Sequence, residues 1–367
     1  MKNYFVFLGI AALTMAACTK TEIDETLVPD QKISFQVADY VHQTRADGDA
    51  TATPSSFLYE FTDPNNAQFT CNAFMKGAGV DNYQNFFPVA GEIIKWNASE
   101  KEWAPSSHDY YWPKSAESYV NFFSWYDTGA GPTTKENGKI EWKDREIGTG
   151  DNIMYADPAW RFQKNTVTYK LDGVSEGIPT LFHHALAQVE FRAYATKLSV
   201  ENVCTWTIKL TDLELKVANK GTLTLTATEP SSGFNIQGTW GETAPAWVPA
   251  EEKKSIMSTT FDVTKTVATC EAAKLLANQS VLPQNLSGVN LTFKLDITTT
   301  YGTGETSVTH QEIIPVNIPM SEFNTTEWAL NTKYIYTLKI EPADQRVLFD
   351  PAVEADWTVV NTAEKAL

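Results

Sequence analysis

Two short stretches near the start of the sequence carry residues suited to covalent processing. Cys18 follows Leu13-Thr-Met-Ala-Ala at the end of an apolar segment. Small residues before a cysteine allow a signal peptidase to cut there, after which the thiol can be acylated, and this pattern resembles a bacterial lipobox. Arg45 is the one basic residue of the polar run 44–49, where a trypsin-like protease could cut between Arg45 and Ala46. The alternatives are an ordinary secretory peptide with an incidental cysteine, and a surface loop that stays uncut.

The sequence predicts neither a metal site nor a catalytic centre. His183 and His184 are neighbours, and adjacent residues of a strand point to opposite faces, so such a pair rarely chelates one ion. We instead expect His183 to hydrogen-bond to backbone where two domains meet. Carboxylates are plentiful, but no spacing singles out a glycosidase pair. There is no nucleophile-elbow, zinc-protease or phosphate-loop motif. The expectation is therefore no enzyme activity, no cofactor and no metal.

Tryptophans near polar or Gly/Pro-rich segments suggest a second function. Trp96, Trp103, Trp240 and Trp247 lie in such segments, where a planar ring on the rim of a β-sandwich can stack on a sugar. The alternative is ordinary packing of these rings in the core and in hairpins. Binding of glycans by a surface lipoprotein is thus the second interpretation.

Charge and cysteine content narrow the classes of partner and compartment. The formal net charge of −16 argues against nucleic acid as a partner. Lys2 followed by the apolar residues 4–17 predicts a signal peptide that is too short to span a bilayer. No later run reaches that length, so the chain from residue 19 on is expected to be soluble and outside the cytoplasm. After Cys18 an odd number of cysteines remains, expected to be mostly buried thiols with room for one disulfide; they are Cys71, Cys204 and Cys270.

The stretch from Ile33 to Ala46 predicts a half-buried strand followed by an accessible loop. Apolar residues alternate with polar ones, and we expect one face to be buried. The residues of that face are Ile33, Phe35, Val37 and Val41.

From Phe57 on, short strands between turn signals predict sandwiches rather than βαβ units. Residues 119–125 are apolar on both faces, which indicates a central strand. Apolar and polar residues alternate over a dozen positions in 289–301, which predicts a strand. A short strand is also predicted over Phe57–Phe61. Residues 271–277 form the one plausible short helix. We expect two sandwiches joined near residues 181–189.

An ordered set of landmarks along the chain resembles the fimbrillin-like (Mfa-like, FimA-like) lipoproteins of Bacteroidales. These are the lipobox at Cys18, the strand with Thr44-Arg45-Ala46, Tyr111-Trp-Pro, Phe122-Phe-Ser-Trp-Tyr126, Asp151-Asn-Ile-Met-Tyr-Ala156, Phe182-His-His-Ala-Leu-Ala-Gln-Val189, Val281-Leu-Pro-Gln284, Trp328 with Lys333-Tyr-Ile-Tyr336, and Val353 with Trp357. The resemblance implies two transthyretin-like β-sandwich domains and a structural, anchor or tip subunit of a pilus. Two features depart from the pattern: Asn331-Thr332 replaces the usual glycine, and the tail past Trp357 is short. They leave open whether the subunit belongs to a polymerising stalk.

The predicted layout is a signal peptide over 1–17, a tether with a removable strand over 18–45, and sandwiches over 46–182 and 183–367. We expect Cys18 to hold the protein on outer-membrane lipid and a trypsin-like surface protease to cut after Arg45. Loss of the first strand would open the N-terminal sandwich to a strand from another pilus subunit, in a homo- or hetero-polymer. The expected donor is the C-terminal stretch, with Val353, Trp357 and Val359 as its inserted side chains.

Overall fold

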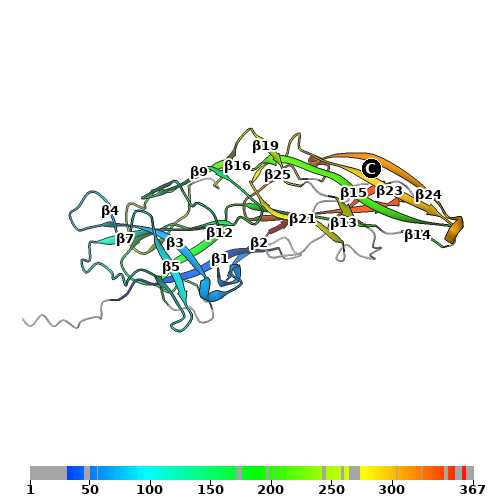
Figure 1. Cartoon of the computed structure of the whole chain (residues 1–367). Helices are drawn as coiled ribbons and strands as arrows, with labels where there is room; N and C mark the ends of the chain where they lie inside the picture. The colour runs from blue at the N-terminus through cyan, green and yellow to red at the C-terminus, as the bar shows by residue number, and fades with distance from the viewer. Residues whose placement is uncertain are drawn as a thin grey trace, which may run out of the picture.

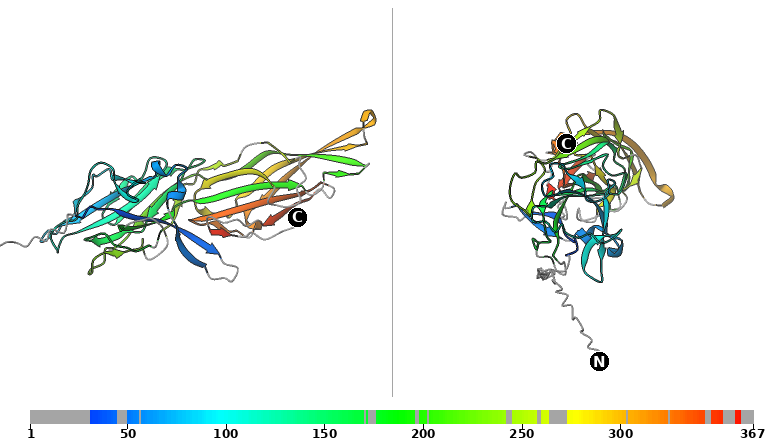
Figure 2. Two further views of the ribbon diagram at one scale, coloured as in Figure 1. Left: turned by 90° about the horizontal axis from the view of Figure 1, so that it is seen from below. Right: turned by 90° about the vertical axis from the view of Figure 1, so that its left-hand side faces the viewer.

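The chain folds almost entirely into β-strands, which confirms the predicted all-β class (Figure 1). The molecule is elongated, with the N-terminal strands at one end and long hairpins at the other (Figure 2). The computed structural model describes residues 31–44, 50–55, 57–169, 171, 176–195, 198–201, 203–241, 245–257, 260–263, 273–302, 304–323, 325–342, 346–351 and 358–360.

Seven strands near the N-terminus pair in a closed ring. Their order is β7 (Tyr119–Asp127), β10 (Ile153–Ala156), β12 (Ile178–His184), β1 (Phe35–Thr44), β6 (Glu102–Pro105), β5 (Glu92–Asn97) and β3 (Gln68–Lys76), and β3 pairs again with β7. The inward side chains form one apolar cluster that includes Phe35, Phe69, Trp103 and Phe122. The central position predicted for residues 119–125 is confirmed, because β7 pairs with β3 on one side and with β10 and β11 (Ala159–Phe162) on the other.

A four-stranded sheet packs against the outside of this ring. It contains β18 (Trp247–Pro249), β16 (Lys220–Thr226), β9 (Lys139–Glu146) and β8 (Thr134–Glu136). Trp142 of β9 and Leu223 of β16 share a second apolar cluster with Phe123 of β7 and Trp160 of β11. Segments far apart in the sequence therefore bury one another's apolar side chains in this cluster.

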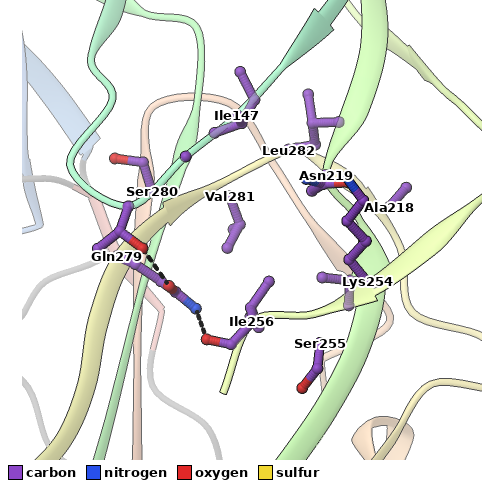
Figure 3. A pocket seen from close by; sticks show the side chains of 13 residues that line it. Ile147, Ala218, Asn219, Lys254, Ser255, Ile256, Gln279, Ser280, Val281 and Leu282 are labelled. Carbon is purple, nitrogen blue, oxygen red and sulfur yellow. Dashed lines mark hydrogen bonds between the residues drawn. The ribbon is translucent and has the colours of Figure 1, made fainter. Parts of the chain in front are cut away.

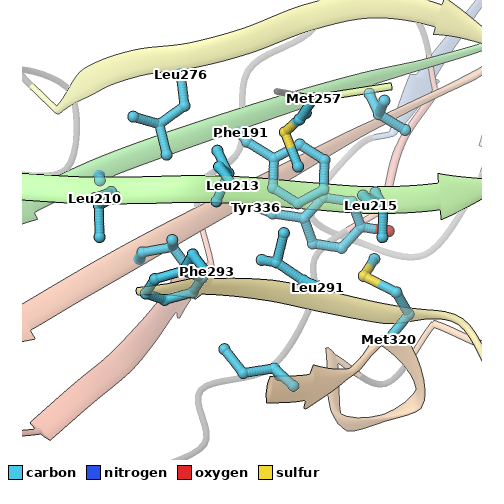
Figure 4. Packing of buried hydrophobic residues seen from close by; sticks show 14 of the residues in the cluster. Phe191, Leu210, Leu213, Leu215, Met257, Leu276, Leu291, Phe293, Met320 and Tyr336 are labelled. Atoms are coloured by element: carbon cyan, nitrogen blue, oxygen red, sulfur yellow. The ribbon is translucent and has the colours of Figure 1, made fainter. Parts of the chain in front are cut away.

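The C-terminal part is built from two sheets that enclose a third core (Figure 4). One sheet contains β21 (Lys274–Val281), β13 (Ala187–Ala195), β26 (Thr332–Glu341), β27 (Arg346–Pro351) and β28 (Thr358–Val360). The other contains β14 (Ser199–Val200), β15 (Cys204–Ala218), β23 (Asn290–Tyr301), β24 (Val308–Pro319), β19 (Lys253–Ser255) and β20 (Phe261–Asp262). Alternation predicted for residues 289–301 is confirmed by the inward residues Leu291, Phe293, Leu295 and Ile297.

A bulge keeps β15 facing this core along its whole length. Leu210 and Leu213 both point inward, although residues three apart on a regular strand face opposite ways. The pairing with β23 shifts between Thr211 and Glu214, and Asp212 between them has φ = 54°. One extra residue in β15 thus restores the apolar face, as β-bulges do.

The strands β15 and β16 form one long path that passes from one sheet into another. Only Asn219 separates them. At the joint, the side-chain amide of Gln284 accepts a hydrogen bond from the N–H of Ala218 (3.0 Å) and donates one to its carbonyl (2.9 Å). The backbone groups of Ala218 are therefore satisfied where the chain changes sheets.

Two local predictions are wrong. Residues 274–277 lie in β21 rather than in a helix, because pairing with β13 buries Leu276 and outweighs the helix propensity of Ala, Lys and Leu. Residues Phe57–Glu60 form the 3-10 helix η1 rather than a strand. The rings of Phe57 and Phe61 lie 5.2 Å apart, whereas a strand would separate the two residues by about 13 Å.

The remaining elements are short. They are β2 (Ala50–Ser55), β4 (Gln84–Asn85), β17 (Ile236–Gln237), β22 (Gln284–Asn285), β25 (Glu327–Trp328), η2 (Pro64–Asn66), η4 (Gly304–Thr306) and η5 (Met320–Phe323). The expected division between residues 182 and 183 falls inside β12, and the division into two domains stays a prediction.

Candidate functional site: the N-terminal strand

The strand β1 closes the ring of seven strands. Its first half, Phe35–Asp39, runs parallel to Ile178–Phe182 of β12. On its other side, a single antiparallel pair, Phe35 with Trp103, connects it to β6. β1 is therefore the segment whose loss would open the ring.

Three of the four apolar side chains predicted for the buried face of β1 lie in the core. Ile33, Phe35 and Val37 are each at most 1% exposed. The ring of Phe35 meets those of Phe69 and Phe122 edge-on at 5.6 and 5.8 Å. Val41 belongs to β1 by its backbone, but its side chain lies outside the described residues. At about 1.5–3 kcal/mol for each buried side chain, these contacts hold β1 firmly in the uncut chain.

The opposite face of β1 is buried as well, which the sequence did not indicate. Residues 165–169, here called the strap, lie over it. The side-chain carbonyl of Gln36 accepts hydrogen bonds from the N–H groups of Thr168 (2.8 Å) and Tyr169 (2.7 Å), and its amide donates to the carbonyl of Tyr169 (2.7 Å). The Asn165 amide donates to the carbonyl of Lys32 (2.9 Å) and to the Ser34 hydroxyl (3.0 Å). β1 is thus enclosed from both sides.

The second half of β1 leaves the ring in a hairpin with β2. Residues Asp39–Thr44 pair antiparallel with Ala50–Ser55, and the hairpin projects from the ring (Figure 2). Thr44, the last residue of β1, pairs with Ala50, the first residue of β2. Arg45 and Ala46 themselves lie outside the described residues.

The structure brings the predicted removable strand and part of the predicted donor together. β28, which contains Val359, pairs in parallel with Thr332–Tyr334 of β26 and also contacts β1. Val353 and Trp357 lie outside the described residues, as does the side chain of Val359. Cys18 is outside them too.

The two adjacent histidines serve separate contacts. His183 Nε2 lies 3.1 Å from Asp157 Oδ1, so a carboxylate is one of its partners, and the expected bond to backbone stays a prediction. His184 points the other way and is buried, with Nδ1 3.1 Å from Asn152 Oδ1 and Nε2 3.5 Å from Glu60 Oε1. Among the described residues, no group of three or more His, Cys, Asp or Glu side chains is arranged to hold a metal ion.

The contact with His184 ties η1, just after the hairpin, to β12. Burial tends to raise the pKa of the Glu60 carboxyl, but the hydrogen bond and charge of His184 and the hydrogen bond from Asn152 together lower it below its ordinary value. A lowered pKa in the folded state means that the carboxylate stabilises the fold above the ordinary pKa of 4.5. That stabilisation is lost as the pH falls through the lowered value.

Replacing Glu60 with glutamine should therefore reduce stability more at pH 7 than at pH 3. The check is urea unfolding of the wild type and of Glu60→Gln at both values, with Glu305→Gln, an exposed position, as the control. An equal deficit at pH 7 and pH 3 would show that the ionised carboxylate contributes nothing through this contact.

The tryptophans considered for sugar stacking are not free platforms. Trp103, Trp240 and Trp247 are buried, and Trp96 is half-buried against the ring core. The indole N–H groups of Trp240 and Trp247 donate to the carbonyls of Ala156 (2.8 Å) and Ala185 (2.6 Å). These rings pack as core residues, which removes the observation that favoured glycan binding.

A cavity of about 300 Å³ lies beside the joint of β15 and β16 (Figure 3). The Gln279 amide crosses it, donating to the Ile256 carbonyl (2.7 Å) and accepting from the Thr149 hydroxyl (3.4 Å). Among the described residues of its lining, Lys254 is the one titratable residue, and its ammonium bonds to Glu146 at 2.6 Å. The lining thus supplies no acid–base pair for catalysis.

Cys71 and Cys204 are buried free thiols, as expected for the cysteines of the folded part. Burial raises the pKa of the Cys71 thiol to about 12, so it is held protonated. Cys270 is outside the described residues.

A family model described as fimbrillin-like matches residues 44–357. The chain belongs to the fimbrillin-like family. Membership in this family gives it a pilus-related role and a place at the cell surface or in a fimbria, and points away from an enzyme. The family match begins at the last residue of β1, so nearly all of that strand lies outside it.

Similar solved structures include candidate cell adhesion proteins of two genera. One from Bacteroides uniformis is 12% identical, with 92% of this chain and 98% of that chain covered and a TM-score of 0.36. One from Parabacteroides distasonis has the same identity, coverage and TM-score. A fimbrial protein from Bacteroides ovatus is 9% identical, with 77% of this chain and 47% of that chain covered and a TM-score of 0.28. No curated protein matches the sequence. Within the described part of the chain, no helix has the length and apolar character needed to cross a bilayer.

Proposed function

We propose that this fimbrillin-like chain is a structural, anchor or tip subunit of a pilus that assembles by strand exchange. In this proposal it is exported as a lipoprotein acylated at Cys18, held on outer-membrane lipid, and cut after Arg45 by a trypsin-like surface protease. Removal of β1 then lets a strand from another subunit enter the N-terminal sandwich. Two tandem sandwiches, divided near residues 182 and 183, would provide the acceptor groove in the N-terminal one and the donor strand in the C-terminal one.

The single observation that carries the proposal is the position of β1. It closes a ring of strands with three buried side chains, yet its second half leaves the ring in a hairpin, and Arg45 follows its last residue in the sequence. A cut after Arg45 separates β1 from the chain without breaking any other strand. What remains is an open apolar groove with unpaired backbone on β12, which accepts an equivalent strand by β-augmentation.

The donor in this proposal is the C-terminal stretch around Val353, Trp357 and Val359. The contact between β1 and β28 supports a link between the two events, because removal of β1 also removes one neighbour of the C-terminal strand. β28 is only three residues long and pairs with a single strand, β26, in the described part of the chain. Few backbone bonds oppose its release.

Replacing Arg45 with alanine should leave the protein uncut, monomeric and still attached to lipid. The reason is that a trypsin-like protease requires the basic side chain, which polar residues in the same loop cannot replace. The measurement is N-terminal sequencing and mass analysis of cell-surface protein, which separates chains starting at acylated Cys18 from those starting at Ala46, together with gel analysis of oligomers.

The matched control is Asp47→Ala, which changes the same loop and keeps the basic residue. It should be cut and should assemble like the wild type. Oligomers of Arg45→Ala at the wild-type level would show that this cut has no role in assembly. A wild-type chain that begins at Thr19 without lipid would remove the lipoprotein claim alone.

A further inference from the structure

The two halves of β1 are held by different partners, and only one of these partners belongs to the ring. Phe35–Asp39 pair with β12, whereas Asp39–Thr44 pair with β2. Within the described residues, β2 pairs with β1 and with no other strand. Loss of β1 would therefore leave β2 as a six-residue strand without a sheet partner.

The register fixes which backbone groups of β2 face β1. Pro54 has no N–H and lies opposite Tyr40, so this position cannot exchange the two hydrogen bonds of a bonded antiparallel pair. Bonded and non-bonded pairs alternate along an antiparallel ladder. Thr51 and Thr53, opposite Gln43 and Val41, therefore direct their backbone groups at β1. Ala50, Ala52 and Pro54 direct theirs away.

The base of β2 is anchored in the ring independently of β1. Phe57, two residues after β2, is fully buried, and its ring stacks on that of Phe182 with centroids 4.4 Å apart. Its ring also lies 5.8 Å from those of Trp103 and Tyr126. Together with the Glu60–His184 contact, these rings hold the start of η1 against β12 when β1 is gone.

We propose that β2 is a clamp that stays with the cut subunit and pairs with the second half of the strand that replaces β1. The occupant is the C-terminal stretch of a second copy of this chain, so the inference rests on the strand exchange proposed above. That strand must be about as long as β1, ten residues, to reach both partners. Its first half meets β12 through buried side chains, and its second half meets β2 through backbone bonds. Such bonds depend little on side-chain identity, so the clamp sets the length and register of the donor rather than its sequence.

The test uses the full chain cut at Arg45 by limited trypsin digestion, with the product checked by mass analysis. Two fluorescent peptides serve as probes: residues 33–44, which span both halves of β1, and residues 33–39, which stop where pairing with β2 begins. Each peptide is first exchanged into the cut chain in place of β1. Its release from that complex then gives its dissociation rate. We expect the longer peptide to leave at least tenfold more slowly, equivalent to about 1.4 kcal/mol.

Two proline substitutions separate the clamp from a general effect on the hairpin. Thr51→Pro removes a backbone donor that faces β1, whereas Ala52→Pro removes one that faces away. Thr51→Pro should abolish most of the tenfold advantage of the longer peptide, and Ala52→Pro should keep it. Circular dichroism of the uncut variants confirms that both are folded before the comparison.

Four results would decide against the clamp or against its assigned register. Equal dissociation rates for the two peptides on the wild type would overturn it, and this comparison requires no substitution. Equal loss of the advantage in Thr51→Pro and Ala52→Pro would overturn the assigned register. If both peptides exchange but β2 has no effect, strand exchange survives and only the clamp fails. If neither peptide exchanges, the proposed assembly mechanism fails, and the clamp fails with it.

Discussion

Replacing Phe35 with alanine should lower the free energy of unfolding of the uncut chain by about 3–5 kcal/mol, as expected for a fully buried phenylalanine. Its ring is enclosed by Phe69 and Phe122 in the ring core, and the truncation leaves a cavity that the surrounding strands cannot fill. The same change should have no effect on a cut chain from which β1 has departed. Urea unfolding of the two forms provides the measurement.

The control for Phe35→Ala is Phe122→Ala on β7. Phe122 lies in the same cluster but on a strand that stays with the subunit, so its truncation should destabilise the uncut and cut forms alike. A Phe35→Ala variant that is as stable as the wild type before cutting would mean that β1 does not contribute to the core. A Phe35→Ala deficit that persists after cutting would mean that β1 has not left the cut chain.

Replacing Phe57 with alanine should lower stability by a similar amount, about 3–5 kcal/mol, in both the uncut and the cut form. Phe57 is fully buried between η1 and β12, and its ring contacts five other aromatic rings, those of Phe61, Phe69, Trp103, Tyr126 and Phe182. Phe57→Ala should thus lower stability in both forms, whereas Phe35→Ala should lower it only in the uncut form. This difference separates a retained anchor from a removable strand.

The conservative change Phe57→Leu should recover a large part of that stability, because an apolar side chain of similar volume fills most of the space. Hydrogen exchange of residues 50–55 gives an independent readout. In Phe57→Ala the amides of Thr51 and Thr53 should exchange faster even before cutting, since the hairpin loses its fixed base. Unchanged protection there would show that η1 does not anchor β2.

Alternating patterns in the sequence were enough to place β1 and β23 and to assign their buried faces. Phe35 and Val37 point inward as their spacing predicts, and so do Leu291 and Phe293. In both strands the period of two is unbroken, so the spacing identifies the apolar face. In β15 simple alternation is interrupted at the bulge around Asp212, and the sequence marks it by a step of three between the apolar residues Leu210 and Leu213.

Contacts between distant segments account for what the sequence could not indicate. Gln36 reads as a solvent-facing residue of a half-buried strand, yet its amide is satisfied by Thr168 and Tyr169, more than 130 positions away. Closure of the ring by β3 and β7 is equally non-local. Helix propensity at residues 274–277 was overridden for the same reason, because Leu276 gains more from the core than the backbone gains from a short helix.

The path of β15 and β16, separated only by Asn219, gives the molecule an axis that can carry tension. A pull between the N-terminal ring and the far hairpins runs along the covalent backbone of Cys204–Thr226, so it does not have to separate two bodies joined by a loop. Along β15 the ladder with β23 lies parallel to that pull, so its hydrogen bonds are sheared together rather than opened one after another. At the joint, the Gln284 amide secures Ala218 where the backbone passes between sheets. If subunits assemble by the proposed strand exchange, each would resist stretching along these strands, and the exchanged strand would be the first place to yield.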